Sequence, residues 1–346
     1  MAIQVDKSSS RPPIKSRPVA ASLILMMGIA GLLLGIAASI SFGAADIHLA
    51  TVWEAVFRFN PDLTQHQIIR ELRMPRAAAA TLVGAGFAVS GAIMQGMTRN
   101  PLADSGLLGI NSGAAFVIVI CFAFMKGLSF TALMLFSFGG AALGAGLVFG
   151  ISSLSRGGLS PVRLALAGAA VSALLSALGE GISIHFRIGQ DLAFFYAGGV
   201  AGVKWEHVKL ILPWVFGALA VAMALSRSIT LLSLGEEIAT GLGQRTGVVK
   251  IIGMVVVFVL AGASVALVGS IGFVGLIIPH LTRFLVGVDY RWIIPCSAVL
   301  GGLLMLLADL AGRLVHPPYE TPVGALIAVI GVPFFLYLAR QQRREM

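Results

Sequence analysis

The sequence has few charged residues for its length. Of its 346 residues, 11% are Asp, Glu, Lys or Arg, whereas about 25% is usual in a soluble domain. Hydrophobic residues make up 58% of the chain, and the mean hydropathy is +0.95. This composition excludes an ordinary soluble domain and favours a protein with several apolar helices that cross a membrane.

The sequence also lacks the common motifs of catalysis and nucleotide binding. It has no Gly-Lys dipeptide, which excludes a phosphate-binding loop of the Walker type. It has no HExxH motif, no paired nucleophile and base, and no histidines at metal-ligand spacing. Its two cysteines, Cys121 and Cys296, lie inside apolar runs and are expected to pack there rather than form a disulfide. We therefore predict no catalytic residue, no metal site and no cofactor.

The net charge of +9 does not indicate a nucleic-acid partner, because no basic face with interleaved aromatic residues is present. Most Lys and Arg residues instead fall in segments between apolar runs. Placing the more basic segments in the cytoplasm follows the positive-inside rule and puts both termini inside the cell. The chain is thus expected to be a multi-pass membrane protein, and the family resemblance given below implies a bacterial plasma membrane.

The apolar runs predict an all-α polytopic membrane protein. Residues 19–339 form the expected transmembrane domain, between cytoplasmic tails at residues 1–18 and 340–346. About ten spans are expected. They are residues 19–42, 77–97, 106–124, 130–154, 163–186, 209–225, 249–267, 271–286, 291–310 and 323–338, the eighth being a short piece broken by Pro279.

Three polar stretches separate these spans. Residues 46–71 are expected outside the cell with a short interfacial helix, and residues 187–207 form an outer loop with a partial helix. Residues 226–247 are expected inside the cell, and the resemblance given below implies that residues 228–247 are a cytoplasmic loop that couples to an ATPase subunit. An internal repeat aligns Leu82–Gly109 with Leu260–Gly287. The two copies run in opposite directions, which is the inverted-topology repeat common in transporters.

Two arginines at the expected outer end of the second span are exceptions to the positive-inside rule. Arg73 and Arg76 flank Pro75, which suits the first turn of a helix. Unpaired outer arginines favour a docking site for carboxylates of a partner, because a guanidinium forms forked, charge-assisted hydrogen bonds. The alternative is anchoring to lipid headgroups.

Two inner segments are further candidates. Asn100 and Pro101 form a turn after the second span, which is either a plain connection or a functional one. Leu234–Gly243 is amphipathic, and Leu234, Ile238 and Leu242 recur at helical spacing. It suits a groove in a cytoplasmic partner, and an ordinary solvated loop is the alternative.

Two acids lie in apolar surroundings, Glu180 and Asp309. Their distance from the preceding inner arginines places both near the outer end of a span. A cap or a pair with a nearby arginine is therefore favoured over ion coupling. The near absence of charge at the membrane midplane argues against a proton or sodium relay.

Several ordered motifs together resemble the permease subunits of iron–siderophore, haem and cobalamin importers, the FecCD/BtuC-type family of ABC transporters. The resemblance covers nearly the whole chain after the N-terminal tail. The motifs that carry it are Leu72–Arg76, Gly91–Gln95, Asn100–Ala103, Leu107–Gly109, Arg163–Gly168, Leu234–Glu236, Gly272–His280 and Ala308–Asp309.

The resemblance implies two permease subunits, two cytoplasmic ATPase subunits and an external solute-binding protein. It implies that Arg73, Arg76 and Arg313 meet acidic residues of the binding protein. Asn100 and Leu102 resemble inner-gate residues. The segment expected to couple to the ATPase contains Leu234, Gly235, Glu236, Glu237, Ile238, Leu242 and Gly243.

The chain departs from the cobalamin permease at Pro161 and Val162, where that protein has small hydroxyl residues. We therefore expect a ferric-siderophore importer permease, with a cobalamin or haem permease of the same family as the alternative. A secondary transporter would work without ATPase subunits. A membrane enzyme would need a catalytic cluster, which the sequence does not show.

Overall fold

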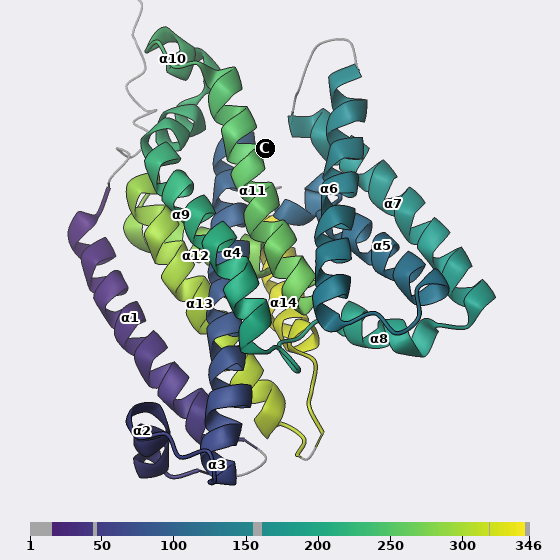
Figure 1. Ribbon diagram of the computed structural model, residues 1–346. Helices are drawn as coiled ribbons and strands as arrows, with labels where there is room; N and C mark the ends of the chain where they lie inside the picture. The colour runs from purple at the N-terminus through teal and green to yellow at the C-terminus, as the bar shows by residue number, and fades with distance from the viewer. Residues whose placement is uncertain (1–15, 44–46, 155–160, 318, 343–346) are drawn as a thin grey trace, which may run out of the picture.

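All regular elements in the described part of the chain are helices, as the sequence predicts (Figure 1). The structure, a computed structural model, describes residues 16–43, 47–154, 161–317 and 319–342. Most of the expected N-terminal tail, residues 1–18, and the end of the C-terminal tail lie outside these ranges. The expected all-α class is confirmed.

Within the described residues, seven helices are long and apolar enough to cross a membrane, by length and composition. They are α1 (Pro18–Ser41), α4 (Met74–Thr98), α6 (Phe130–Leu154), α7 (Pro161–Phe186), α9 (Trp205–Leu234), α11 (Thr246–Val268) and α13 (Tyr290–Leu314). Three further helices of the described chain are apolar, but their apolar segments are shorter than 18 residues. They are α5 (Ile110–Phe124), α12 (Val274–Val286) and α14 (Val323–Gln342).

The remaining elements are short and connect the spans. They are α2 (Leu49–Phe57), α3 (Thr64–Gln67), the π-helix η1 (Ile68–Arg73), the 3₁₀-helix η2 (Ser105–Leu108), α8 (Gly189–Ala197) and α10 (Glu236–Gly241). Helices α2 and α8 occupy the two segments for which the sequence predicts short outer helices. Helix α10 lies at the opposite end of the bundle from α2 and α3 (Figure 1). These two ends are called the α10 end and the α2 end below.

Helix α4 is the centre of the bundle. Its apolar window is 89% buried, against 22% for α1 at the periphery. It packs on α9, α11, α12 and α13. Its small residues allow this, because a Cβ at Gly84 would overlap the carbonyl of Gly301 on α13. The span that carries the outer arginines is thus the one that most of the others touch.

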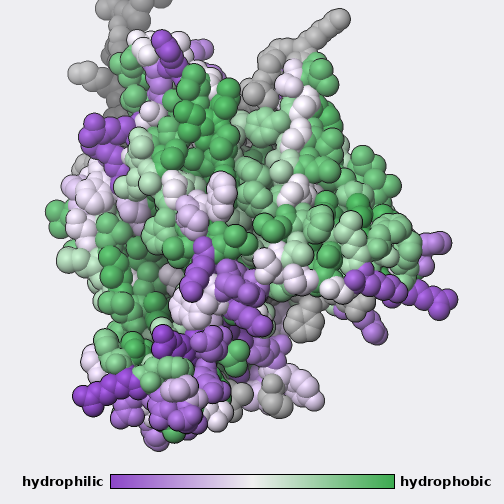
Figure 2. Space-filling view, viewed as in Figure 1, coloured by the Kyte–Doolittle hydropathy of each residue, from purple (hydrophilic) through white to green (hydrophobic). Residues whose placement is uncertain are grey.

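The surface supports a membrane location. Figure 2 shows hydrophobic residues over α6, α7 and α11, and hydrophilic residues gathered at the α2 end. Exposed large apolar side chains occur along α1, α6 and α9, for example Leu34, Leu147 and Trp214. Lipid tails are a better solvent for such helix faces than water.

The predicted internal repeat aligns α4 with α11, and these two helices pack in opposite directions. Gly86, in the middle of α4, lies against Ser264 near the end of α11, and Met97, near the end of α4, lies against Gly253 in the first half of α11. Opposite directions are what an inverted-topology repeat requires.

The sixth span is longer than the expected 209–225. Helix α9 continues to Leu234 through residues that the sequence analysis assigned to a polar loop. Three hydroxyl groups, of Ser226, Thr230 and Ser233, donate hydrogen bonds to carbonyls three or four residues earlier in the same helix. The hydrogen bonds of these hydroxyl groups are made within α9 itself, so the polar residues do not end the helix. The polar composition alone therefore predicted the end of the span too early.

Pro279 does not break the eighth apolar segment, contrary to the sequence-based expectation. It lies inside α12. Proline has no N–H, so the carbonyl of Gly275, four residues earlier, loses its helical partner. The side-chain amide of Gln95 on α4 donates to that carbonyl at 3.3 Å. A neighbouring helix therefore supplies the hydrogen bond that the proline removes.

The third span begins later than expected. Residues 105–108 form the 3₁₀-helix η2, capped by the Asp104 carboxylate, which accepts from Ser105 N at 2.8 Å. Gly109 then adopts a left-handed conformation with φ of 70° before α5 begins.

Candidate functional site

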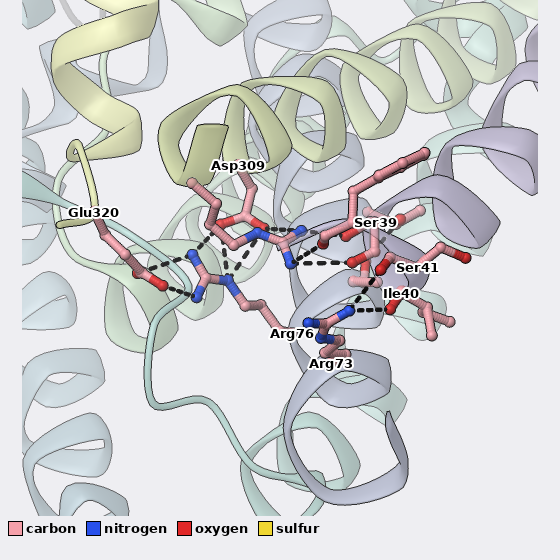
Figure 3. A network of polar contacts seen from close by, with 11 residues as sticks. Ser39, Ile40, Ser41, Arg73, Arg76, Asp309 and Glu320 are labelled. Carbon is pink, nitrogen blue, oxygen red and sulfur yellow. Dashed lines mark hydrogen bonds and ion pairs between the residues drawn. The ribbon is translucent and has the colours of Figure 1, made fainter. Parts of the chain in front are cut away.

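The candidate outer site is a cluster of three arginines and two carboxylates at the α2 end, here called the arginine cluster. Its members are Arg73, Arg76, Asp309, Arg313 and Glu320 (Figure 3). The first two lie where η1 passes into α4, with Pro75 in the first turn of α4. Asp309 and Arg313 lie one turn apart near the end of α13, and Glu320 lies between α13 and α14.

Arg76 binds two carboxylates at once. Its Nε and Nη2 donate to Asp309 Oδ1 at 3.0 and 2.7 Å, while Nη1 and Nη2 donate to Glu320 at 2.7 and 3.0 Å. The Asp309 side chain is fully buried, the Arg76 side chain is 15% exposed and that of Glu320 is 45% exposed. The cluster thus has a buried carboxylate on one side of Arg76 and an accessible one on the other.

Arg73 and Arg313 hold the end of α1. Arg73 Nη1 donates to the carbonyls of Ile40 and Ser41, at 2.6 and 2.9 Å. Arg313 Nη1 donates to the carbonyl of Ser39, and its Nη2 donates to the Ser39 hydroxyl at 2.6 Å. The last carbonyls of a helix have no partner within it, so these two guanidinium groups act as its cap.

The expectation that the outer arginines are unpaired is therefore wrong. Arg73 and Arg313 are each 8% exposed, and Arg313 Nη2 also lies 3.2 Å from Asp309 Oδ2. The favoured pairing of Asp309 with an arginine is confirmed. Glu180 is exposed on α7.

The candidate inner gate is the turn after α4. Arg99 ends that helix in a left-handed conformation, with φ of 52°. The Asn100 side-chain oxygen accepts from Leu102 N at 2.9 Å, which closes the turn. Leu102 is partly buried and packs with Leu276 and Leu338 of α12 and α14. The turn therefore touches two helices besides those that it joins.

The second part of the expected gate lies at the start of α7. The side chains of Pro161 and Val162 fall outside the described residues.

The candidate coupling segment contains a shorter helix than the sequence predicts. Helix α10 covers only Glu236–Gly241, while Leu234 ends α9 and Leu242 follows α10. The three apolar side chains of the segment are nevertheless exposed: Leu234 by 39%, Ile238 by 52% and Leu242 by 65%. Glu237 and Gly243 are exposed as well. An apolar surface of this kind, at the tip of the α10 end, is suited to contact with another protein.

Glu236 ties this segment to α11. Its Oε1 accepts from Lys250 Nζ at 2.7 Å and from Thr246 Oγ1 at 3.2 Å. The hydrogen bond from Lys250 is the main cause that lowers the pKa of Glu236, and partial burial opposes it. Gly235, with φ of 137°, starts α10 beside the guanidinium of Arg99. The coupling segment and the gate turn are thus neighbours.

Three residues were missed by the sequence analysis: Glu320 and Ser39 at the outer site, and Gln95 at the contact between α4 and α12. Glu320 was a lone carboxylate in a proline-rich loop, and Ser39 was one small residue in an apolar run. Gln95 was noted only as part of a family motif. The only available signal for Gln95 was that it is a polar residue in an apolar run. Its side chain donates to the Gly275 carbonyl, which has lost its helical partner because of Pro279.

Other sequence-based expectations concern metals and thiols. Cys121 and Cys296 are buried free thiols, as predicted. Among the described residues, no group of three or more His, Cys, Asp or Glu side chains is arranged to hold a metal ion.

Comparison with known proteins assigns the chain to a family. The chain is 59% identical to the iron(3+)-hydroxamate import system permease protein FhuB of Bacillus subtilis, over 96% of this chain and 86% of that protein. It is 44% identical to the iron-uptake system permease protein FeuB of the same organism, over 93% and 97%. The hemin transport system permease protein HmuU of Yersinia pestis is 36% identical, over 93% and 97%.

The fold also matches a solved structure. That protein, described as a metal-chelate type ABC transporter in an inward-facing conformation, superposes with a TM-score of 0.81 and 31% identity, covering 92% of this chain and 99% of that one. Residues 31–341 match the FecCD transport family. The chain is a multi-pass permease of a bacterial membrane and not an enzyme, and it belongs to the FecCD transport family.

Proposed function

We propose that this chain is the permease subunit of an ATP-driven importer for ferric siderophores. The observation that carries the proposal is its 59% identity, over nearly its whole length, to a permease for iron(3+)-hydroxamate. A haem permease is also related, at 36% identity, so haem and cobalamin are the substrates to test against.

The proposed complex has two permease subunits, identical or different, around one pathway. Two ATPase subunits bind at the α10 end, which then lies in the cytoplasm with both termini. A solute-binding protein binds at the α2 end, outside the cell. Two features support this orientation. Basic residues flank the α10 end, as the positive-inside rule expects of a cytoplasmic face, and the arginine cluster at the α2 end has guanidinium groups that suit acidic side chains of a partner.

The ATPase is proposed to bind the exposed apolar side chains of the coupling segment. Because α10 is joined to α11 through Glu236 and Lys250, movement of α10 is passed to a spanning helix. Arg99 lies beside Gly235, so the same movement reaches the gate turn at Asn100 and Leu102. ATP binding would in this way change the contacts of Leu102 with α12 and α14.

Uptake by cells tests the substrate. Cells that lack the gene, and the same cells with the gene restored, are given radiolabelled iron on a panel of siderophores, with haem and labelled cobalamin in parallel. Restored uptake of a ferric siderophore is the expected result. Restoration of haem or cobalamin uptake alone would overturn the substrate assignment while leaving the family unchanged.

A further inference from the structure

Glu320 is the one member of the arginine cluster that can be exchanged at low cost. Asp309 is fully buried on α13 and contacts both Arg76 and Arg313. Glu320 lies in the loop before α14, its side chain is 45% exposed, and its pair with Arg76 lies at the surface. Exposed ion pairs contribute little to stability, whereas a buried charge that loses its partner is costly.

The geometry around Arg76 presents a ready seat for a carboxylate. Its Nη1 and Nη2 point toward the two oxygens of Glu320, at 2.7 and 3.0 Å, in the forked arrangement that suits a carboxylate (Figure 3). Nε and Nη2 remain engaged by Asp309. A carboxylate from outside can therefore reach this fork only by taking the place of Glu320.

The charge count alone would admit a third carboxylate, but the excess positive charge lies on Arg73 and Arg313, which are each 8% exposed and donate to carbonyls of α1. The cluster holds three guanidinium groups and two carboxylates. A third carboxylate placed beside Glu320 would be repelled by it, since like charges at contact distance disfavour each other. Exchange of one carboxylate for another keeps the charge around buried Asp309 unchanged, and Arg73 and Arg313 can keep their hold on α1.

We infer that Glu320 is an internal carboxylate that occupies the docking seat on Arg76, and that an acidic residue of the solute-binding protein replaces it. This inference rests on the proposed function. Glu320 thereby weakens docking and makes release of the binding protein easier after each transport cycle.

The test is the affinity of the solute-binding protein for the permease–ATPase complex in lipid nanodiscs. The probe is the purified solute-binding protein that supports uptake in the cell assay, loaded with its ferric siderophore. Glu320→Gln frees the fork of Arg76, so the Kd should fall about two- to fivefold, the range that an exposed ion pair supplies. Glu54→Gln, which removes an exposed carboxylate from α2 at the same end, is the matched control and should leave the Kd unchanged.

The outcomes separate this inference from the docking proposal. An unchanged or raised Kd for Glu320→Gln, or an equal fall for Glu54→Gln, would overturn the exchange. The single change R76Q removes the fork, and buried Asp309 keeps Arg313 as its ion-pair partner at 3.2 Å. An unchanged Kd in that variant would show that the binding protein does not use the cluster, and both proposals would then fail. A raised Kd there together with no gain from Glu320→Gln would overturn the exchange alone.

Discussion

The side-chain amide of Gln95 on α4 donates a hydrogen bond to the backbone carbonyl of Gly275 on α12, the acceptor that Pro279 leaves free. It also lies 3.4 Å from the carbonyl of Leu276. Gln95 is 1% exposed, so these contacts are shielded from bulk solvent. Helix α4 thus supplies the hydrogen-bond donor that Pro279 removes from α12. This contact fixes the position of the two helices relative to each other along their axes.

Replacing Gln95 with Leu should lower the free energy of unfolding by about 1–3 kcal/mol, because it leaves a buried carbonyl without a donor. The Pro279→Ala change restores the missing N–H. The double variant should therefore lose less than the sum of the two single changes. Thermal or denaturant unfolding of the purified protein measures the free energies of this double-mutant cycle. Additive losses of the two single changes would contradict the hydrogen bond between Gln95 and the Gly275 carbonyl.

Gly91 and Gly275 lie where the backbones of α4 and α12 touch. A methyl group at Gly91 would overlap the carbonyl of Gly275. We expect Gly91→Ala to destabilise the protein by roughly 1–3 kcal/mol, the usual cost of overpacking. Gly217→Ala, in α9 where no atom lies near, is the control and should be neutral or stabilising. Equal effects of the two changes on the unfolding midpoint would contradict the close contact.

Asp309 and Glu320 should differ sharply as supports of the fold. Asp309→Asn leaves Arg76 and Arg313 without their buried carboxylate, at a cost of about 3–5 kcal/mol. Glu320→Gln breaks an exposed pair, so its cost should stay below about 1 kcal/mol. Both are read from unfolding of the purified protein in one detergent. A larger loss for Glu320→Gln would show that its pair with Arg76 is structural.

The exposed side chain of Ile238 should matter for assembly with the ATPase but not for folding. Ile238→Asp is expected to reduce ATPase assembly at least tenfold, because a charge then enters an apolar contact (about 1.4 kcal/mol or more). Phe57→Asp makes the same change on α2, at the opposite end, and should assemble normally. Co-purification of the ATPase with each variant gives the answer, and normal assembly of Ile238→Asp would remove the coupling proposal.

The tie between Glu236 and Lys250 predicts a pH dependence. The pKa of Glu236 is lowered in the folded protein, chiefly by the hydrogen bond from Lys250. The stabilisation is therefore present above the ordinary glutamate pKa of about 4.3 and is lost as the pH falls through the folded value. The difference in unfolding midpoint between the native protein and Glu236→Gln should be constant from about pH 6 to 8 and shrink below about pH 4. A difference that grew on acidification would have the wrong sign.

Hydropathy predicted the helical class and most spans. A spanning helix satisfies its backbone hydrogen bonds within itself, so a run of apolar residues in the sequence is enough to identify it. The side-chain hydrogen bonds between distant residues could not be predicted in this way. The end of α9 was misplaced because Ser226 and Thr230 look like loop residues until their hydroxyl groups find carbonyls in the helix. The break expected at Pro279 depended on Gln95, which is far away in the sequence.

The outer site shows the same limit. The sequence predicted that Arg73 and Arg76 needed partners, because they oppose the positive-inside bias. It placed those partners on another protein, whereas the structure provides the α1 carbonyls, Asp309 and Glu320 within the chain. Only the folded chain brings residues 39–41, residues 73–76, Asp309, Arg313 and Glu320 together (Figure 3).

The most direct test of the central claim is transport by the purified complex. The permease, its ATPase subunits and the solute-binding protein are reconstituted in proteoliposomes, and accumulation of a radiolabelled ferric hydroxamate is followed with ATP and without it. We predict accumulation that requires ATP, the binding protein and an intact coupling segment. Accumulation without ATP, or none of any ferric siderophore while haem or cobalamin is carried, would contradict the account.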